Sequence, residues 1–216
     1  MYKIRTGRPS DKREEKEERI YDFLDAIGVS YERVDHEALF TIEACQKVDE
    51  ILGFEICKNL FLVNSNRSQF YLLLMMPNKN LSTKDLKVQI NSTRLSFGTA
   101  DLLLQTLNLT AGSVNVCSLL YDIDNKVKLL IDEDILKQEY FGFHPMLNTS
   151  TLKVNVRDFV SKIIPALKHE PTIVKIPSRR AYENFIRFHG RHDFHHAKRQ
   201  RNEGGRTQAL RFDKGV

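Results

Sequence analysis

Residues 56–63 read Ile56-Cys57-Lys58-Asn59-Leu60-Phe61-Leu62-Val63, a strand-like run of apolar residues with one lysine in it. A second apolar run, residues 69–76, follows the polar residues 64–68. Two such runs are typical of a β-hairpin in a sheet that is covered on at least one face. An unpaired ammonium group is costly to bury in a strand. Lys58 is therefore either a functional or paired residue, or one whose stem packs while its charge stays in water.

Short helices and strands alternate on both sides of this hairpin. Hydrophobic periodicity and N-cap residues predict helices at residues 11–27, 42–48, 82–90, 101–107 and 157–167, the first opened by a capping pair of Asp11 and Glu14. Runs of β-forming residues predict strands at 29–34, 94–97, 113–116, 126–132, 140–144, 151–156 and 172–176. This mixture predicts an α/β (mixed α+β) single compact domain built on a mixed sheet.

The composition, 41% hydrophobic and 28% charged over 216 residues, is typical of a soluble globular chain. The longest uninterrupted apolar run, residues 70–76, is far shorter than the ~20 residues of a membrane-spanning helix. The N-terminus also leads into charges rather than an apolar signal core, so we expect a cytoplasmic protein with no membrane partner. Cys45, Cys57 and Cys117 are odd in number and widely spaced, which indicates free thiols rather than disulfides or a zinc site.

The net charge of +5 is concentrated in the last forty residues. Residues 177–216 contain ten Lys/Arg and four Asp/Glu, whereas residues 1–176 contain 23 Lys/Arg and 24 Asp/Glu. We expect a loose N-terminal arm at residues 1–16, a folded domain at 17–176, and a basic tail at 177–216 that is disordered or folds only on a partner. Four tail histidines are close together, but without a cysteine or a flanking fold they indicate a solvated basic segment rather than a metal site.

Common catalytic motifs are absent, including the dinucleotide fingerprint, the P-loop, the H-E-x-x-H zinc motif and the G-x-S-x-G motif. What remains is a set of polar residues at strand ends and turns. These are Lys58, Asn59, Gly112, Ser113, His144 and Asn148. Each also has a purely structural explanation, since Gly112 could end a helix, His144 could be a hydrogen-bonded strand end and Asn148 could form a turn.

Seven blocks of this sequence, in order, resemble the YbaK-type aminoacyl-tRNA deacylases, the free-standing relatives of the editing domain inserted in bacterial prolyl-tRNA synthetases. The blocks are Tyr31–His36, Phe40–Glu43, Cys57–Leu62, Arg94–Phe97, Gly112–Val114, Val127–Asp132 and Phe143–Asn148. The resemblance covers roughly residues 17–176 and is greatest to the branch that hydrolyses alanyl-tRNA(Pro), the prolyl-tRNA synthetase associated domain proteins. It implies a mixed α/β domain with a partly barrel-like sheet flanked by helices.

The resemblance also implies a function, namely hydrolysis of the ester of mischarged tRNA(Pro), most of all Ala-tRNA(Pro), with no metal or other cofactor. It makes Lys58, Gly112 and His144 the candidate catalytic residues. Candidate substrate-binding residues are Asn59, Thr41, Ser113 and Asn148. The implied partners are tRNA and prolyl-tRNA synthetase.

One departure from the family pattern is visible in the glycine loop. The family commonly has Gly-x-x-Pro, whereas this chain has Gly112-Ser113-Val114-Asn115. Asn115 therefore keeps open a different class of function, a tRNA- or synthetase-binding module that retains the fold without catalysis.

The basic tail suits a tRNA substrate, because Lys and Arg bind phosphates and interleaved aromatic rings stack on unpaired bases. Candidate tail contacts to tRNA are Arg179, Arg180, Arg187, Lys198 and Arg199. The alternative is a solvated extension with no part in turnover.

Deleting residues 177–216 is expected to weaken the salt dependence of tRNA binding. The slope of log K against log salt should flatten by about 0.7–0.9 for each phosphate contact that is lost. Titrations of full-length and shortened chains with tRNA over about 50–200 mM salt measure this slope. Equal slopes for the two chains would identify the tail as a solvated extension.

Overall fold

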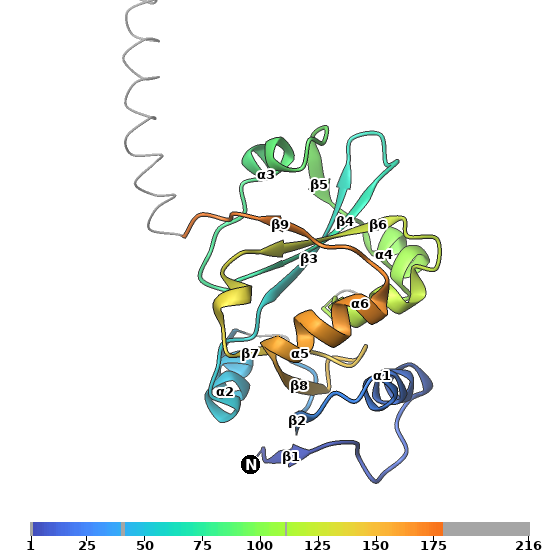
Figure 1. The fold of residues 1–216 in the computed structure, drawn as a ribbon, viewed down its shortest axis with the longest axis vertical. Coiled ribbons are helices and arrows are strands. Elements are labelled where there is room, and N and C mark those ends of the chain that lie inside the picture. The colour runs from blue at the N-terminus through green and yellow to red at the C-terminus, as the bar shows by residue number, and fades with distance from the viewer. Residues whose placement is uncertain (1, 40–41, 111, 179–216) are drawn as a thin grey trace, which may run out of the picture. The chain divides into compact units, whose positions relative to one another are not determined.

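The computed structural model describes residues 2–39, 42–110 and 112–178, and the ribbon is shown in Figure 1. The chain divides after Ile176 into two units, and the fold below is that of the first. Its strands are β1 (Ile4–Thr6), β2 (Tyr31–Asp35), β3 (Lys58–Asn64), β4 (Phe70–Met75), β5 (Leu95–Phe97), β6 (Val127–Asp132), β7 (Tyr140–Phe143), β8 (Ser150–Asn155) and β9 (Thr172–Val174).

The α-helices are α1 (Glu15–Ala26), α2 (Ile42–Leu52), α3 (Thr83–Gln89), α4 (Ala100–Leu107), α5 (Val156–Asp158) and α6 (Ile164–Leu167). Short 3₁₀ helices are η1 (Val116–Tyr121) and η2 (Ile135–Lys137), and a π-helical turn, η3 (Phe159–Ile163), joins α5 to α6. Pro165 explains the π-turn, because proline lacks the N–H that an α-helix would use and its ring displaces the carbonyl one turn earlier.

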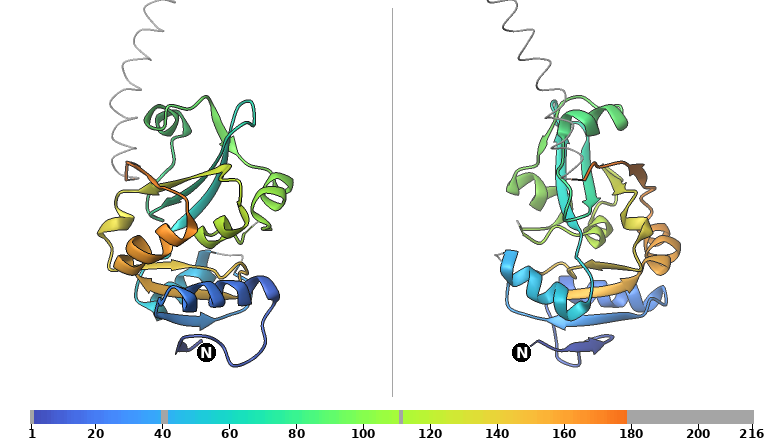
Figure 2. Two further views of the ribbon diagram at one scale, coloured as in Figure 1. Left: turned by 45° about the vertical axis from the view of Figure 1, so that its right-hand side comes forward. Right: turned by 90° about the vertical axis from the view of Figure 1, so that its left-hand side faces the viewer.

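The described strands form two sheets rather than the one sheet that the sequence predicted. An antiparallel sheet has the order β1-β2-β8-β7, and a mixed sheet has the order β5-β3-β4-β6-β9. Within the mixed sheet β3 pairs antiparallel with β4 and β5, whereas β4–β6 and β6–β9 are parallel. The mixed α/β class is confirmed, and Figure 2 shows the two sheets at different levels of the molecule.

The central strand β4 is buried on both faces. Leu72 and Leu74 join the largest core, while Tyr71 and Leu73 join a second core on the opposite face. This explains why residues 70–75 are uninterruptedly apolar instead of alternating with polar residues.

The two faces of β4 have different covers. The second core is closed by α3, which contributes Leu86. The largest core includes side chains from α1, from the antiparallel sheet and from the helix of residues 156–167. In Figures 1 and 2 this last helix lies between the levels of the two sheets.

Several local predictions are confirmed. The β3–β4 hairpin pairs Lys58 with Met75 and Val63 with Phe70, and Asn64 closes its turn by accepting from the backbone N–H groups of Ser68 and Gln69. The predicted cap of α3 is also present, with the Ser82 side chain accepting from the Asp85 N–H.

Three local predictions are wrong. The arm expected at residues 1–16 is not loose, because β1 pairs with β2 and Arg8 forms ion pairs with Glu18 and Asp22. Asp11 does not cap the first helix, which begins at Glu15 after Glu14 in the N-cap position. The strand expected at residues 113–116 is a loop that leads into η1, because the Asn115 side chain caps that helix.

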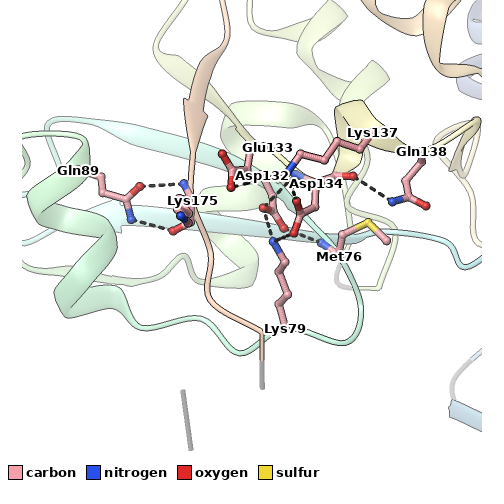
Figure 3. Close-up of polar contacts among 9 residues, drawn as sticks. All are labelled: Met76, Lys79, Gln89, Asp132, Glu133, Asp134, Lys137, Gln138 and Lys175. Atoms are coloured by element: carbon pink, nitrogen blue, oxygen red, sulfur yellow. Dashed lines mark hydrogen bonds and ion pairs between the residues drawn. The ribbon is translucent and has the colours of Figure 1, made fainter. Parts of the chain in front are cut away.

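The ends of β4 and β6 are joined by a buried ion pair. Lys79, 5% exposed, places Nζ 2.7 Å from Oδ1 of the fully buried Asp132 and 2.5 Å from Oδ2 of Asp134 (Figure 3). The other oxygen of Asp132 accepts from the Met76 N–H at 3.2 Å. The pair therefore fixes the loop after β4 against the end of β6.

Figure 3 also shows a reciprocal amide contact between α3 and the residue after β9. The Gln89 side chain donates to the Lys175 carbonyl at 3.0 Å and accepts from the Lys175 N–H at 2.8 Å. This side chain takes the place of a neighbouring strand at the edge of the mixed sheet, which limits unpaired backbone groups there.

Replacing Lys79 by methionine is expected to lower the free energy of unfolding by about 3–5 kcal/mol, because Asp132 would stay buried without its cation. Urea titrations followed by circular dichroism measure the loss. The matched control is Lys137→Met, since Lys137 is an exposed cation that also pairs with Asp134, at 2.6 Å. Exposed pairs contribute little, so a loss for Lys79→Met as small as that of the control would contradict the importance of the buried pair.

Candidate functional site

Lys58 is the first residue of β3, and its side chain is exposed rather than buried. Its ammonium lies 3.4 Å from the carbonyl oxygen of Lys79, in the loop that the Lys79–Asp132 pair fixes. The exposed position agrees with the alternative in which the charge stays in water, and it leaves the ammonium accessible to a ligand.

Cys57 and Asn59 flank Lys58. The Cys57 thiol is buried and lies 3.8 Å from the Gly142 carbonyl oxygen at the end of β7, which ties the start of β3 to that strand. Burial raises the pKa of Cys57 to about 12, so this thiol stays protonated at neutral pH and is no nucleophile. Asn59 is half-buried and folds back, donating to the Cys57 carbonyl at 3.3 Å.

Gly112 lies in an exposed loop with φ +86°, a conformation that favours glycine. An added Cβ would meet no atom within 4 Å, so the backbone here is open to the close approach of a ligand. Ser113 is buried, and its N–H donates to the Thr110 carbonyl at 3.2 Å. Its role as a substrate contact stays a prediction of the resemblance.

Asn115 replaces the family's proline and shapes the glycine loop in a different way. Its φ of −152° is inaccessible to proline, whose ring holds φ near −65°. The fully buried side chain accepts from the Ser118 N–H at 3.1 Å and donates to the Ser113 carbonyl at 2.9 Å. The same amide nitrogen lies 3.7 Å from the Met146 sulfur, so it links the glycine loop to the loop that follows His144.

His144 immediately follows β7 and is half-buried. Its Nδ1 lies 2.8 Å from the Ser150 carbonyl oxygen and 3.3 Å from the Thr151 hydroxyl, and its ring lies edge-on to that of His36 with centroids 5.9 Å apart. Burial lowers the pKa of His144 to about 4, with nearby His36 acting in the same direction and the Ser150 carbonyl against it. The imidazole is therefore neutral at pH 7.

Asn148 lies in the connection between β7 and β8. Its amide nitrogen donates to the Leu39 carbonyl at 2.6 Å, which ties this connection to the segment before α2. Within the described part of the chain its buried Oδ1 has no hydrogen-bond partner. Such an atom is a candidate acceptor for a ligand, since buried polar groups are nearly always paired.

Three segments contact β7 or the connection at residues 144–149 that follows it. Cys57, next to Lys58, contacts Gly142 of β7, Asn115 of the glycine loop contacts Met146, and Asn148 contacts Leu39 in the segment before α2. Thr41 lies outside the described residues, as do the predicted tail contacts Arg179, Arg180, Arg187, Lys198 and Arg199.

Sequence reasoning missed His36, Thr151, Lys79 and Asp132 as parts of this region. His36 and Thr151 are 115 residues apart in the chain, and no local pattern brings them together. Lys79 and Asp132, 53 residues apart, carried no signal beyond ordinary loop and strand-end polarity.

The described residues hold no group of three or more His, Cys, Asp or Glu side chains that could bind a metal ion. Nor does any helix among them have the length and apolarity to cross a membrane.

The low pKa of His144 predicts a loss of stability in mild acid. An unfolded histidine has a pKa near 6.5, so between about pH 6.5 and 4 the unfolded chain binds a proton that the folded chain does not. The free energy of unfolding should fall over this window, and burial of His36, which also lowers its pKa, adds in the same direction. Denaturation at several pH values should show a shallower fall for His144→Gln, and a wild-type His144 ring that titrates near pH 6.5 in NMR would contradict the prediction.

Comparison with known proteins places this geometry in a family context. The family model described as the aminoacyl-tRNA editing domain matches residues 36–162. The chain is 32% identical over 143 residues to the prolyl-tRNA editing protein ProX of Acetoanaerobium sticklandii, which covers 66% of this chain and 87% of that protein. It is 30% identical over 169 residues to prolyl-tRNA synthetase associated domain-containing protein 1 of Mus musculus, a match that covers 76% of this chain and 96% of that protein.

The fold is also similar to a structure solved as a candidate trans-editing enzyme for prolyl-tRNA synthetase. The TM-score is 0.57 at 15% identity, over 77% of this chain and 99% of the other. At that identity the likeness shows the fold alone, and membership follows from the sequence matches. The chain belongs to the aminoacyl-tRNA editing domain family.

Proposed function

We propose that this protein is a trans-editing deacylase that hydrolyses the ester of mischarged tRNA(Pro), with alanine as the preferred aminoacyl group. Family membership supports the reaction class, and the names of two relatives support tRNA(Pro) and prolyl-tRNA synthetase as substrate and partner. The observation that supports the proposal is a pair of contacts near His144. Cys57, next to Lys58, contacts Gly142, and Asn115, in the loop of Gly112, contacts Met146, so both segments lie against the part of the chain that carries neutral His144.

Hydrolysis of an aminoacyl ester develops negative charge on the carbonyl oxygen, and oriented N–H groups or a nearby cation stabilise it. The exposed backbone at Gly112 permits the ester to approach closely, since among the described residues no atom lies within 4 Å of the place that a side chain would take. The Lys58 ammonium, exposed at the end of β3, binds the terminal phosphate or the developing oxyanion.

Water is the proposed nucleophile. The Cys57 thiol stays protonated, and an imidazole with a pKa of about 4 is a poor general base at neutral pH. A water oriented with the help of the ribose hydroxyl of the substrate therefore suits this site. His144 then acts on selectivity, because a pocket that it narrows accepts alanine and excludes the larger proline ring.

A second candidate function is a module that binds tRNA or the synthetase without hydrolysis. The observation that favours it is Asn115, which gives the glycine loop a backbone conformation that the family's proline cannot adopt. This candidate predicts that the protein retains Ala-tRNA(Pro) and leaves its ester intact.

The deciding experiment compares hydrolysis of tRNA charged with alanine, serine, cysteine and proline by the full-length protein. Release of alanine with proline spared is the expected result. Retention of tRNA without release of any amino acid would favour the binding module instead.

Replacing Lys58 by alanine is expected to lower the rate of alanine release by ~10²–10³, the usual effect of losing one group that stabilises an oxyanion. The matched control is Lys84→Ala, because Lys84 is an exposed lysine on α3 and should leave the rate unchanged. Equal rates for Lys58→Ala and the wild type would remove Lys58 from the catalytic machinery.

A further inference from the structure

A largely buried series of hydrogen bonds connects His144 to His36 through Thr151. Nε2 of His36 lies 2.8 Å from the Thr151 hydroxyl oxygen, and the same oxygen lies 3.3 Å from Nδ1 of His144. Thr151 is fully buried and His36 is 7% exposed. Buried polar groups need hydrogen-bond partners, so the positions of the protons on the two rings and on the Thr151 hydroxyl are constrained.

Two backbone carbonyls determine which ring nitrogens carry protons. Nδ1 of His36 lies 2.8 Å from the Glu37 carbonyl oxygen, and Nδ1 of His144 lies 2.8 Å from that of Ser150. A carbonyl oxygen only accepts, so in each neutral ring Nδ1 is the donor and Nε2 is unprotonated. The Thr151 hydroxyl must then donate to Nε2 of His36, which leaves its lone pairs free to accept from Nδ1 of His144.

This arrangement leaves one ring nitrogen unused. Nε2 of His144 is an acceptor, and it has no hydrogen-bond partner among the residues for which the structure gives positions. Asn148, on the same connection, has a buried Oδ1 that also lacks a hydrogen-bond partner within the described part of the chain. A loop that offers acceptors is chemically suited to a ligand group that donates N–H or O–H.

We propose that His36 and Thr151 are positioning residues for His144. They hold its ring in one orientation and one tautomer, with Nε2 presented as an acceptor to an N–H or O–H donor of the aminoacyl ester. The role toward the ester rests on the proposed deacylase function. The tautomers and the orientation depend only on the folded chain.

Other ionisable groups near the pair are few among the described residues. Asp35 precedes His36, accepts from the Ser150 hydroxyl at 3.2 Å, and is paired with Arg13 and Arg33. The Tyr2 ring lies edge-on to His36, with centroids 6.1 Å apart. None of these groups contacts the Thr151 hydroxyl, so a change at Thr151 acts first on the two histidines.

The test uses full-length protein labelled with ¹⁵N-histidine, with the two rings assigned from His36→Gln and His144→Gln. In the wild type, both rings should show a protonated Nδ1 and a bare Nε2. Thr151→Val removes the donor to neutral His36, so the pKa of His36 should rise while that of His144 does not. Thr151→Ser keeps the hydroxyl and should leave both titrations in place, and Thr151→Ala is a second variant without the hydroxyl.

Activity gives an independent readout. Without the hydroxyl, kcat/KM for Ala-tRNA(Pro) should fall about tenfold, as for the loss of one net hydrogen bond, while Thr151→Ser stays near the wild type. A wild-type His144 protonated at Nε2 would overturn the proposal. So would unchanged titration of His36 and His144 in the Thr151→Val and Thr151→Ala variants. Absence of hydrolysis by the wild type would refute the deacylase function alone, because the NMR measurements still test the positioning.

Discussion

Burial of β4 on both faces is the constraint from which the rest of the fold follows. A strand with apolar side chains on both faces needs a cover on each side. In this chain α3 closes one side, while α1, the antiparallel sheet and the helix of residues 156–167 close the other. The antiparallel sheet thus acts as part of the cover, because strands that pack on a face of β4 cannot also be its hydrogen-bonded neighbours.

The candidate site lies where this packing ends. Lys58 begins β3, His144 follows β7, and the Lys79–Asp132 pair joins the ends of β4 and β6. Backbone carbonyls at strand ends and in the adjoining loops can accept from side chains. The carbonyl of Ser150, the first residue of β8, does so toward His144, and that of Lys79, in the loop after β4, does so toward Lys58. The sheet thus fixes where the candidate site residues lie, and several of these residues belong to the short connections between strands.

Local patterns in the sequence were sufficient for the parts of the fold that local interactions determine. The β3–β4 hairpin and the Ser82 cap were predicted because turn and cap residues lie within a few positions of the groups they bond. The division into two sheets was not, since strand pairing joins residues such as Arg33 and Leu152 that are far apart in sequence. The same limit applies to the site, where resemblance supplied Lys58, Gly112 and His144 while His36 and Thr151 needed the tertiary structure.

Asn115 has a consequence for how a substitution in the glycine loop acts on the rest of the chain. A proline restrains its loop through its own ring, so its effect stays local, whereas Asn115 restrains the glycine loop through hydrogen bonds and also contacts Met146. An exchange at position 115 is therefore transmitted to the loop that follows His144. Residues in such contact are energetically non-additive. Substitutions at positions 115 and 146 should therefore have non-additive effects on the free energy of unfolding.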